Sequence, residues 1–389
     1  MESTHAEVGV PVQTSPASTL RYMPGLDVVR GLAILMVLVF HGFQPHERIF
    51  ASLPPHAAAF LTSFVRLGHY GVHLFFVLSG FLITGILLDT RTDADYYRNF
   101  YMRRALRILP AYCILLAVLF AMHRITPVFL LVCLLYLCNM PGLLGVNPQY
   151  GPLWSLSVEE QFYLTWPFIV RRLSLRHLAI CCALLILFVP VLRFVLLFGP
   201  HFLQDIGMKT WAVMDFFAAG GCIAIAIRST RLRAKMRKAV VPLLAGGALS
   251  FILLCCIPIP AAPVFRRAVL AVTLEPWLFG FTGMVLFAYL HPAIASGLWA
   301  RPLVFLANIS YGLYLCHQLI FDLVEWHWPF HAIDALSPIP RALIVFFAEV
   351  AVSIAVAWAS RNTVEAFFLK FKPKHRRTTY PAAVPAQVV

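Results

Sequence analysis

Charged residues are scarce in this chain of 389 residues. Asp, Glu, Lys and Arg together make up only 12% of it, whereas hydrophobic residues make up 60% and the mean hydropathy is +0.80. Soluble domains carry about 25% charged residues, so this sequence cannot cover the surface of a soluble protein of its size. The same composition excludes a disordered, collagen-like or disulfide-scaffold chain. The sequence therefore predicts an all-α, polytopic membrane protein.

Metal-ligand and disulfide patterns are also missing. The nine cysteines all fall in apolar segments, without metal-ligand spacing and without a pair at the ends of an aqueous loop. Cysteines in such positions behave as small hydrophobic residues. We therefore predict no metal site, no disulfide framework and no bound cofactor.

Acidic residues are few even among the charged ones, with 17 Asp and Glu against 31 Lys and Arg and a net charge of +14. The basic residues stand in short blocks between apolar runs, which is typical of the cytoplasmic loops of membrane proteins. No basic stretch is interleaved with exposed aromatic residues, so the charge does not indicate nucleic-acid binding. The four blocks cover residues 91–107, 171–176, 228–238 and 361–377.

Eleven apolar runs alternate with these blocks, and a transmembrane helix needs about 20 residues to cross a core of about 30 Å. The run over 126–139 is short, and a Gly-, Pro- and Asn-rich stretch typical of a loop follows it. All four basic blocks face the cytoplasm only if this run does not cross. We therefore predict about ten transmembrane helices in the cytoplasmic membrane, with 126–152 re-entrant or interfacial. The other ten runs are 26–43, 59–88, 108–122, 153–170, 177–198, 211–227, 239–258, 268–290, 303–324 and 341–360.

The two ends of the chain are more polar than the rest. Residues 1–20 are non-periodic and lack the basic start of a signal peptide, so we expect a disordered cytoplasmic tail. Residues 21–365 form the predicted membrane domain, and 366–389 form a basic cytoplasmic tail. We expect no soluble domain at either end.

Ionisable residues inside apolar runs are the most informative, because an arginine at the bilayer centre costs roughly 2.5–3.5 kcal/mol on insertion scales. Arg30 and His41 are eleven positions apart in one run, which places them on the same side of a helix, roughly 16 Å apart along its axis. They face either a shared site or simply the two membrane boundaries. In the next run, Ser79-Gly80 is typical of a close helix–helix contact.

A second group of polar residues follows further along the chain. Arg103, Arg104 and Arg107 precede Pro110, and they form either a solvated basic block or a clamp for phosphates. Glu159 and Glu160 follow Trp154, Ser155 and Ser157, where a serine would cap a helix beginning near the glutamates.

A third group lies within two turns near the end of the chain, where Ser310, Tyr311, Tyr314 and His317 stand together. Tyrosines at a membrane interface are ordinary, but Tyr314 and His317 share a helix face. For the remaining intramembrane acids we expect structural pairing. These acids are Asp215, Glu275 and Glu349.

Across residues 24–365, five of these segments resemble the acyltransferase 3 family of integral membrane O-acyltransferases. They are Arg30 with His41; residues 71–84, similar to GVxLFFVLSGFLIT; Arg104-x-x-Arg107; residues 152–163, which match PLWSLSVEEQFY; and residues 309–320, similar to ISYxLYLxHxxI.

The chain departs from the family pattern at two positions. His73 stands where the family usually has an acid, and Glu365-Ala366 replaces the usual Glu-Pro. The role of the family's carboxylate at the position of His73 therefore stays open, and so does any inference about the turn at Glu365-Ala366.

The resemblance implies transfer of an acyl group, most often acetyl from acetyl-CoA, to a hydroxyl. Acceptors in the family include envelope polysaccharides, their lipid-linked precursors and macrolides, so a carbohydrate-containing acceptor is expected beside the lipid bilayer.

Roles follow from what acyl transfer needs, namely a base, stabilisation of an oxyanion and a hold on the donor. We expect His41 to be the base, Glu159 to orient it, and Arg30 to guide the donor or stabilise charge at the thioester. The acyl-CoA phosphates would meet Arg103, Arg104 and Arg107. The acceptor would contact Trp154, Ser155, Tyr163, Tyr311, Tyr314 and His317.

A transporter or flippase of a glycan or lipid-linked sugar is the alternative, because central Arg, His and Glu residues would suit transport too. No inverted repeat or pair of Gly/Pro-broken helices supports it. A pocket beneath Arg104 and Arg107 that opens to the cytosol would favour the enzyme. An occluded, pseudo-symmetric midplane cavity would favour transport.

Overall fold

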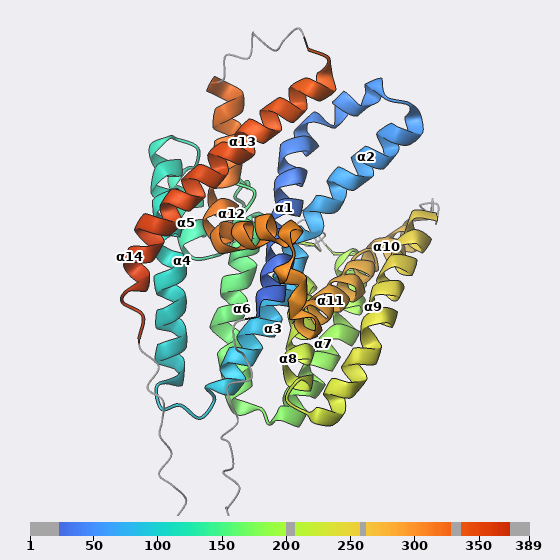
Figure 1. Cartoon of the computed structure of the whole chain (residues 1–389), viewed down its shortest axis with the longest axis vertical. Helices are drawn as coiled ribbons and strands as arrows, with labels where there is room; N and C mark the ends of the chain where they lie inside the picture. Colours follow the sequence, from blue (N-terminus) through green and yellow to red (C-terminus); the bar gives the residue numbers. More distant parts are fainter. Residues whose placement is uncertain (1–22, 200–206, 257–261, 328–335, 374–389) are drawn as a thin grey trace, which may run out of the picture.

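A computed structural model describes residues 23–199, 207–256, 262–327 and 336–373, and these contain helices and no strand. Figure 1 shows the helices side by side in one bundle. The helices are α1 (Pro24–Phe43), α2 (Pro55–Leu67), α3 (Gly71–Asp89), α4 (Tyr96–Ala121), α5 (Pro127–Leu134), α6 (Leu153–Arg172), α7 (Leu175–Leu196), α8 (Thr210–Ala226), α9 (Thr230–Cys256), α10 (Pro263–Ala271), α11 (Glu275–Leu290), α12 (Arg301–His327), α13 (Pro338–Ser360) and α14 (Ala366–Leu369). Short 3₁₀ turns are η1 (Gln44–Ser52), η2 (Gly68–Tyr70), η3 (Pro141–Leu144), η5 (Pro292–Ser296) and η6 (Leu298–Ala300), and η8 (Arg361–Glu365) is one π-helical turn.

Eight helical stretches in the described residues are long and apolar enough to cross a membrane. Four of these stretches are single helices, and the other four join successive elements, as α2 and α3 are joined through η2. The prediction of an all-α, multi-pass membrane protein is thereby confirmed.

Two further helices bring the count close to the predicted ten. Helix α6 has 20 residues but holds two glutamates and two arginines, and α8 has only 17 residues. Both are lined with buried residues and lie among other helices, so they meet protein more than lipid. A helix shielded in this way tolerates polar residues that a lipid-facing helix would not.

The predicted non-crossing segment is confirmed as too short to span. Helix α5 has eight residues, about 12 Å, and the chain from Leu135 to Pro152 has no α-helix. Its backbone is held by protein groups: Gln161 donates to the carbonyl of Tyr136 at 2.7 Å, and Lys209 to that of Asn139 at 2.9 Å. Irregular backbone at membrane depth requires partners of this kind.

Close packing of α3 on α8 depends on small residues. A Cβ added at Gly80 would lie 2.1 Å from the carbonyl oxygen of Phe217, and one at Gly220 would lie 2.1 Å from that of Val77. The two backbones therefore touch where only glycine fits. This agrees with the contact predicted from Ser79-Gly80 and fixes the face that α3 turns to the rest of the bundle.

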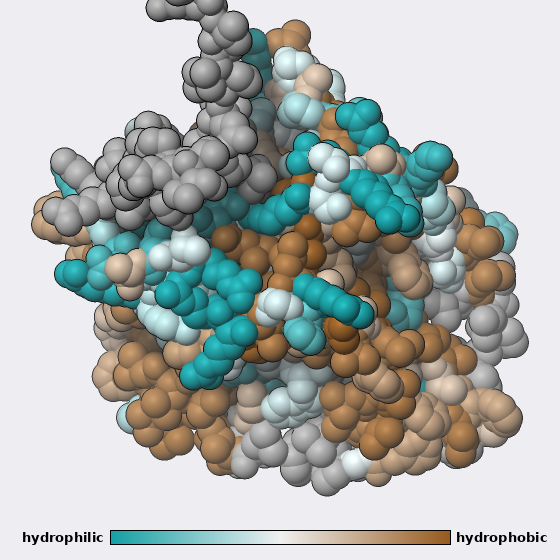
Figure 2. Space-filling model, turned by 90° about the horizontal axis from the view of Figure 1, so that it is seen from below, coloured by the Kyte–Doolittle hydropathy of each residue, from teal (hydrophilic) through white to brown (hydrophobic). Residues whose placement is uncertain are grey.

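Basic residues gather at one end of the bundle. The turns α3–α4, α6–α7 and α8–α9, which carry three of the predicted basic blocks, all lie at the lower end in Figure 1. Figure 2, seen from that end, shows hydrophilic residues in a broad band across the face and apolar residues towards the periphery. Residues 1–20 and 374–389 of the predicted tails lie outside the described residues. Ala366–Leu369, placed by prediction in the basic tail, is helix α14 and packs against α4.

Candidate functional site

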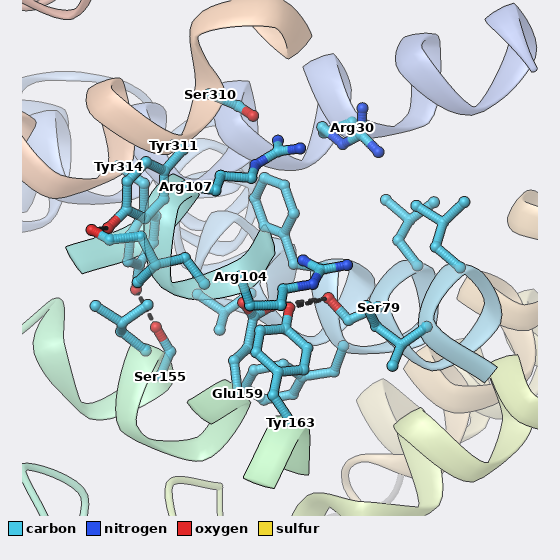
Figure 3. A pocket seen from close by; sticks show the side chains of 18 of the residues that line it. Arg30, Ser79, Arg104, Arg107, Ser155, Glu159, Tyr163, Ser310, Tyr311 and Tyr314 are labelled. Carbon is cyan, nitrogen blue, oxygen red and sulfur yellow. Dashed lines mark hydrogen bonds between the residues drawn. The ribbon is translucent and has the colours of Figure 1, made fainter. Parts of the chain in front are cut away.

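A cavity of about 230 Å³ opens where α1, α3, α4, α6 and α12 meet. Figure 3 shows polar side chains from all five helices turned into it. Three are arginines, whereas Glu159 is the one carboxylate among the residues that line this cavity. The cavity therefore carries an excess of positive charge and suits an anionic ligand.

The three arginines differ in how far the protein neutralises them. Arg30 forms an ion pair of 2.6 Å with Asp27, one turn earlier on α1. Arg104 stacks on the ring of Tyr163, its guanidinium carbon 4.8 Å from the ring centroid. Arg107 is exposed in the cavity and makes no hydrogen bond or ion pair with the described residues. Two guanidinium groups thus keep their donors free for a ligand.

Glu159 is held in place by two hydroxyl groups. Ser79 donates to Oε1 and Tyr163 donates to Oε2, each at 3.0 Å. The two hydroxyl oxygens are themselves 3.1 Å apart, and Figure 3 shows this group beside Arg104. Both carboxylate oxygens are therefore occupied on the cavity wall.

The apolar run predicted over 153–170 begins where this helix begins, but the expected serine cap just before the glutamates is wrong. Helix α6 begins at Leu153, so Glu159 lies almost two turns inside it rather than in the first turn. Neither serine caps the helix: Ser155 donates to the carbonyl of Pro152 at 3.2 Å, and Ser157 to that of Leu153 at 3.0 Å. Hydroxyls bonded back to the preceding turn are compatible with a continuing helix.

His41 lies in the last turn of α1, beyond the end of the cavity wall. Its Nδ1 is 3.0 Å from the carbonyl oxygen of Val37. A carbonyl oxygen only accepts hydrogen bonds, so Nδ1 carries the proton and Nε2 of the neutral ring keeps its lone pair. The protein thereby presets the tautomer that a general base needs.

His317 of α12 packs edge-on against His41, with ring centroids 4.9 Å apart. It is fully buried, and its Nδ1 is 2.7 Å from the carbonyl oxygen of Tyr314. Its Nε2 has no partner among the described residues. Tyr314 lines the cavity, 5.7 Å from the His317 ring, so a continuous row of rings leads from the cavity to His41.

The predicted pairing of Glu159 with His41 is not found among the described residues. Glu159 bonds to Ser79 and Tyr163, whereas His41 bonds to a backbone carbonyl and contacts His317. The prediction placed both at the outer mouth because it put Glu159 in the first turn of its helix. The two extra turns of α6 carry Glu159 to the level of Ser79 instead.

The residues predicted to meet an acceptor fall into two groups. Ser155, Tyr163, Tyr311 and Tyr314 line the cavity, where Tyr311 donates to the carbonyl of Ile108 at 2.6 Å and Ser155 is hydrogen-bonded to Tyr314. The other two, His317 and Trp154, are not in its lining.

Trp154 belongs to a separate aromatic cluster. Its ring centroid lies 6.4 Å from those of both His69 and His73, and 6.1 Å from that of Phe76. His73, at the position where an acid was expected, is fully buried in this cluster.

Arg103, predicted to bind phosphates, points away from the cavity. It donates to the carbonyl of Pro373 at 2.7 Å and is absent from the cavity lining. Ser79, which the sequence indicated only as a packing residue, lines the cavity and holds Glu159. Its place beside Gly80 in an apolar run offered no sign of a ligand-facing hydroxyl.

The intramembrane acids have a partner that the sequence reasoning missed. Arg193 of α7 is fully buried and donates to Asp215 and, at 2.6 Å, to Glu275. The pairing expected for these two acids is therefore present. Glu349 is also buried, but its Oε1 has no partner among the described residues.

Comparison with known sequences decides the family. The family model described as an acyltransferase domain matches residues 23–358, most of the chain. The chain belongs to the acyltransferase 3 family. All five family-like segments of this acyltransferase 3 chain contribute to the cavity wall, through Arg30, Ser79, Arg104 with Arg107, Glu159 and Tyr311.

Curated relatives of this acyltransferase 3 protein carry acetyltransferase names. O-acetyltransferase OatA of Staphylococcus aureus is 25% identical over 79% of this chain and 52% of its own length. A Bacillus subtilis protein named "Putative peptidoglycan O-acetyltransferase YrhL" is 29% identical over 79% of this chain and 51% of its own. The chain thus spans about half the length of these relatives. No solved structure matches it.

Proposed function

We propose that this protein is a membrane O-acyltransferase that moves an acetyl group from acetyl-CoA to a hydroxyl of a sugar-containing acceptor. The observation that carries the proposal is the cavity itself, in which Arg104 and Arg107 face the interior without an ion-pair partner among the described residues. Family membership and relatives named O-acetyltransferase support the reaction class.

The donor end of the site is the arginine-lined part of the cavity. CoA carries phosphate groups, and guanidinium groups bind phosphate through paired, charge-assisted hydrogen bonds. Arg104 and Arg107 are the groups with free donors, while Arg30 is already partly neutralised by Asp27. In this proposal the phosphates bind Arg104 and Arg107, and the pantetheine arm extends past Arg30 towards Tyr314.

The basic residues also orient the protein in the proposal. Because positive loops stay on the cytoplasmic side, the end that carries the turns α3–α4, α6–α7 and α8–α9 faces the cytosol. Both termini are then cytoplasmic, and the protein belongs to the cytoplasmic membrane. Acetyl-CoA, a cytosolic donor, would enter from this side.

His41 is the base in the proposed reaction. Its free Nε2 removes the proton from the acceptor hydroxyl, whose oxygen then attacks the thioester carbonyl. The C–O bond of the new ester forms, the C–S bond breaks, and the imidazolium returns the proton to the departing CoA thiolate. The products are an acetylated acceptor and free CoA. His317 supports the ring of His41 by its edge-on contact.

Peptidoglycan is the acceptor class that a relative's name suggests, and an envelope glycan is the acceptor we propose. Ser155, Tyr311 and Tyr314 offer hydroxyl groups on the cavity wall that suit the hydrogen-bonding surface of a sugar.

The experiment uses full-length protein in lipid nanodiscs with radiolabelled acetyl-CoA. Release of CoA and transfer of label are followed with and without a crude envelope glycan extract. We expect His41→Ala to lower the rate of transfer by about 10²- to 10⁴-fold, because a positioned base contributes that much. His291→Ala is the matched control, since Nδ1 of His291 makes the same contact with a carbonyl one turn earlier, at 3.0 Å, on an exposed surface.

Transfer that needs His41 but not His291, and that rises with the extract, would support the proposal. Equal rates in wild type and His41→Ala would remove His41 from the mechanism. A wild-type protein that neither binds acetyl-CoA nor releases CoA would overturn the proposed activity and favour transport.

A further inference from the structure

A second cavity, of about 310 Å³, lies on the opposite side of α12 from the first. It is a groove between α4, α12 and α13, and it has almost no polar surface. Its walls include residues that are exposed on the outside of the bundle, among them Ile114, Val118 and Val356. Since these helices are long enough to cross a membrane, the groove opens towards lipid.

Arginines continue the apolar wall of the groove on α4. Ala111, Ile114 and Val118 line it at helical spacing. Arg103 and Arg107 precede Ala111 at intervals of four residues. The side chain of Arg107 turns into the first cavity, whereas Arg103, about three turns before Ile114 on the same side of the helix, extends this stripe towards the basic end of the bundle. The stripe therefore changes from apolar to cationic along one helix.

The facing wall on α13 changes in the same direction. Val356 and Ser360 line the groove, and Arg361 follows at the end of this stripe. The guanidinium of Arg361 is 3.6 Å from a carboxylate oxygen of Glu365, and its side chain is partly exposed. Because α13 and α4 pass each other in opposite directions and α14 packs on α4, the two cationic ends lie together.

Lys372 adds to the cluster at this end of the groove. Burial and the nearby charges of Arg107, Arg103 and Arg361 lower its pKa below the usual range for a lysine. Within this group of side chains, Glu365 is the one acid. The cluster therefore carries net positive charge that the described side chains do not balance.

We propose that the groove binds one acyl chain of an anionic phospholipid, with the phosphate of its head group on Arg361, Arg103 and Lys372. The apolar part of the groove suits the acyl chain of such a lipid. The cationic end, which lies at the basic end of the bundle, suits its phosphate head group. A neutral or zwitterionic lipid would fill the apolar length equally well but would gain nothing from the unbalanced charge. An apolar helix of a partner protein would fill the groove but would bring no counter-charge to its cationic end.

The site is separate from the proposed acyl-transfer site, although both share α4 and α12. The first cavity uses Ser310 and Tyr314 of α12, whereas the groove uses Cys316 and Ile320, which lie on another face of the same helix. The wall between them includes the hydrogen bond from Tyr311 to the carbonyl of Ile108. Lipid binding can therefore be measured without acyl transfer.

The test is native mass spectrometry of the full-length protein released from micelles. The micelles contain phosphatidylglycerol and phosphatidylcholine in equal amounts and with identical acyl chains. We expect wild type to retain phosphatidylglycerol preferentially. Arg361→Gln should reduce that preference about fivefold, because a cation near a lipid head group is worth about that much. Arg176→Gln, at an exposed arginine on α7, is the matched control and should have no effect.

The apolar part is tested by filling the groove. Val356→Trp should lower total retained lipid about tenfold, because it removes the space for several methylene groups. Ala355→Trp, on the lipid-facing side of the same helix but outside the groove, should retain lipid like wild type. If Val356→Trp does not fold, Val118→Trp blocks the groove from α4.

Equal retention of the two lipids by wild type, or retention unchanged by both filling variants, would overturn the proposal. Displacement of the lipid by palmitoyl-CoA but not by acetyl-CoA would also contradict it, since the groove would then hold a donor's acyl chain.

Discussion

Arginines in two regions of the bundle meet opposite surroundings. Arg193 of α7 is fully buried where α7, α8 and α11 meet. It donates hydrogen bonds to Asp215, Glu275 and the carbonyl of Ala212. Arg104 and Arg107, in the cavity between α4 and α6, meet no carboxylate at ion-pair distance among the described residues. The same side-chain type is therefore neutralised in one region and left open in the other.

Whether an arginine has an ion-pair partner distinguishes a structural arginine from a ligand-binding one better than its burial does. Placing a charge in a membrane protein is costly, and protein partners normally offset that cost. Where the partners are present, as around Arg193, the arginine joins helices. Where they are missing but a cavity is present, a ligand of opposite charge is the missing partner. The following predictions test that distinction.

The largest effect is expected from Arg193→Met. Removing the guanidinium leaves the buried Asp215 and the partly buried Glu275 without their shared cation, and breaking a buried ion pair in this way typically costs about 3–5 kcal/mol of stability. We expect a much lower midpoint of thermal unfolding in nanodiscs, followed by intrinsic fluorescence. Arg231→Met, at an exposed arginine, is the control and should unfold like wild type. An unchanged midpoint for Arg193→Met would mean that the buried cluster is not structural.

The opposite pattern is expected from Arg107→Gln. Arg107 has no ion-pair partner among the described residues. Its loss should therefore change the free energy of unfolding by no more than about 1 kcal/mol. Affinity for CoA should fall roughly tenfold or more, the usual loss for one charge-assisted hydrogen bond. Isothermal titration with CoA measures this, and Arg107→Lys should recover part of the affinity. A large loss of stability with unchanged CoA affinity would reverse the assignment.

The cavity arginines without ion-pair partners were predictable from the sequence, whereas the paired, buried Arg193 was not. Arg104 and Arg107 stand three apart in a basic block, a pattern that a helix turns to one face. Arg193 is a single arginine in an apolar run, and its partners lie 22 and 82 residues further on. Only the packing of α7 on α8 and of α11 on α8 brings them together.

The membrane topology was predictable because it rests on length and hydropathy, which act locally. The eight-residue length of α5 bears out the short run at 126–139. The link between Glu159 and His41 failed because it depended on where one helix begins. A start at Leu153 rather than near Glu159 moves the carboxylate by nearly two turns, about 9 Å along the axis.

The smallest effect concerns Lys372, in the unbalanced cationic cluster. Its pKa is lowered by burial and by the charges of Arg107, Arg103, Arg361 and Arg104. The unfolded chain therefore binds more protons than the folded protein in the window between the lowered pKa and the ordinary lysine value. In that window stability rises with pH, because deprotonation relieves the repulsion.

The expected gain is at most about 1 kcal/mol, since the group is partly solvated. It is measured as the difference in unfolding midpoint between wild type and Lys372→Gln from pH 7.5 to 10.5, with Lys370→Gln as the control. Added phosphatidylglycerol should shrink the gain, because the phosphate of the bound head group supplies the counter-charge and favours the protonated lysine. A stability difference that falls with rising pH would show that Lys372 already has a negative partner, and the cluster would then resemble the region around Arg193.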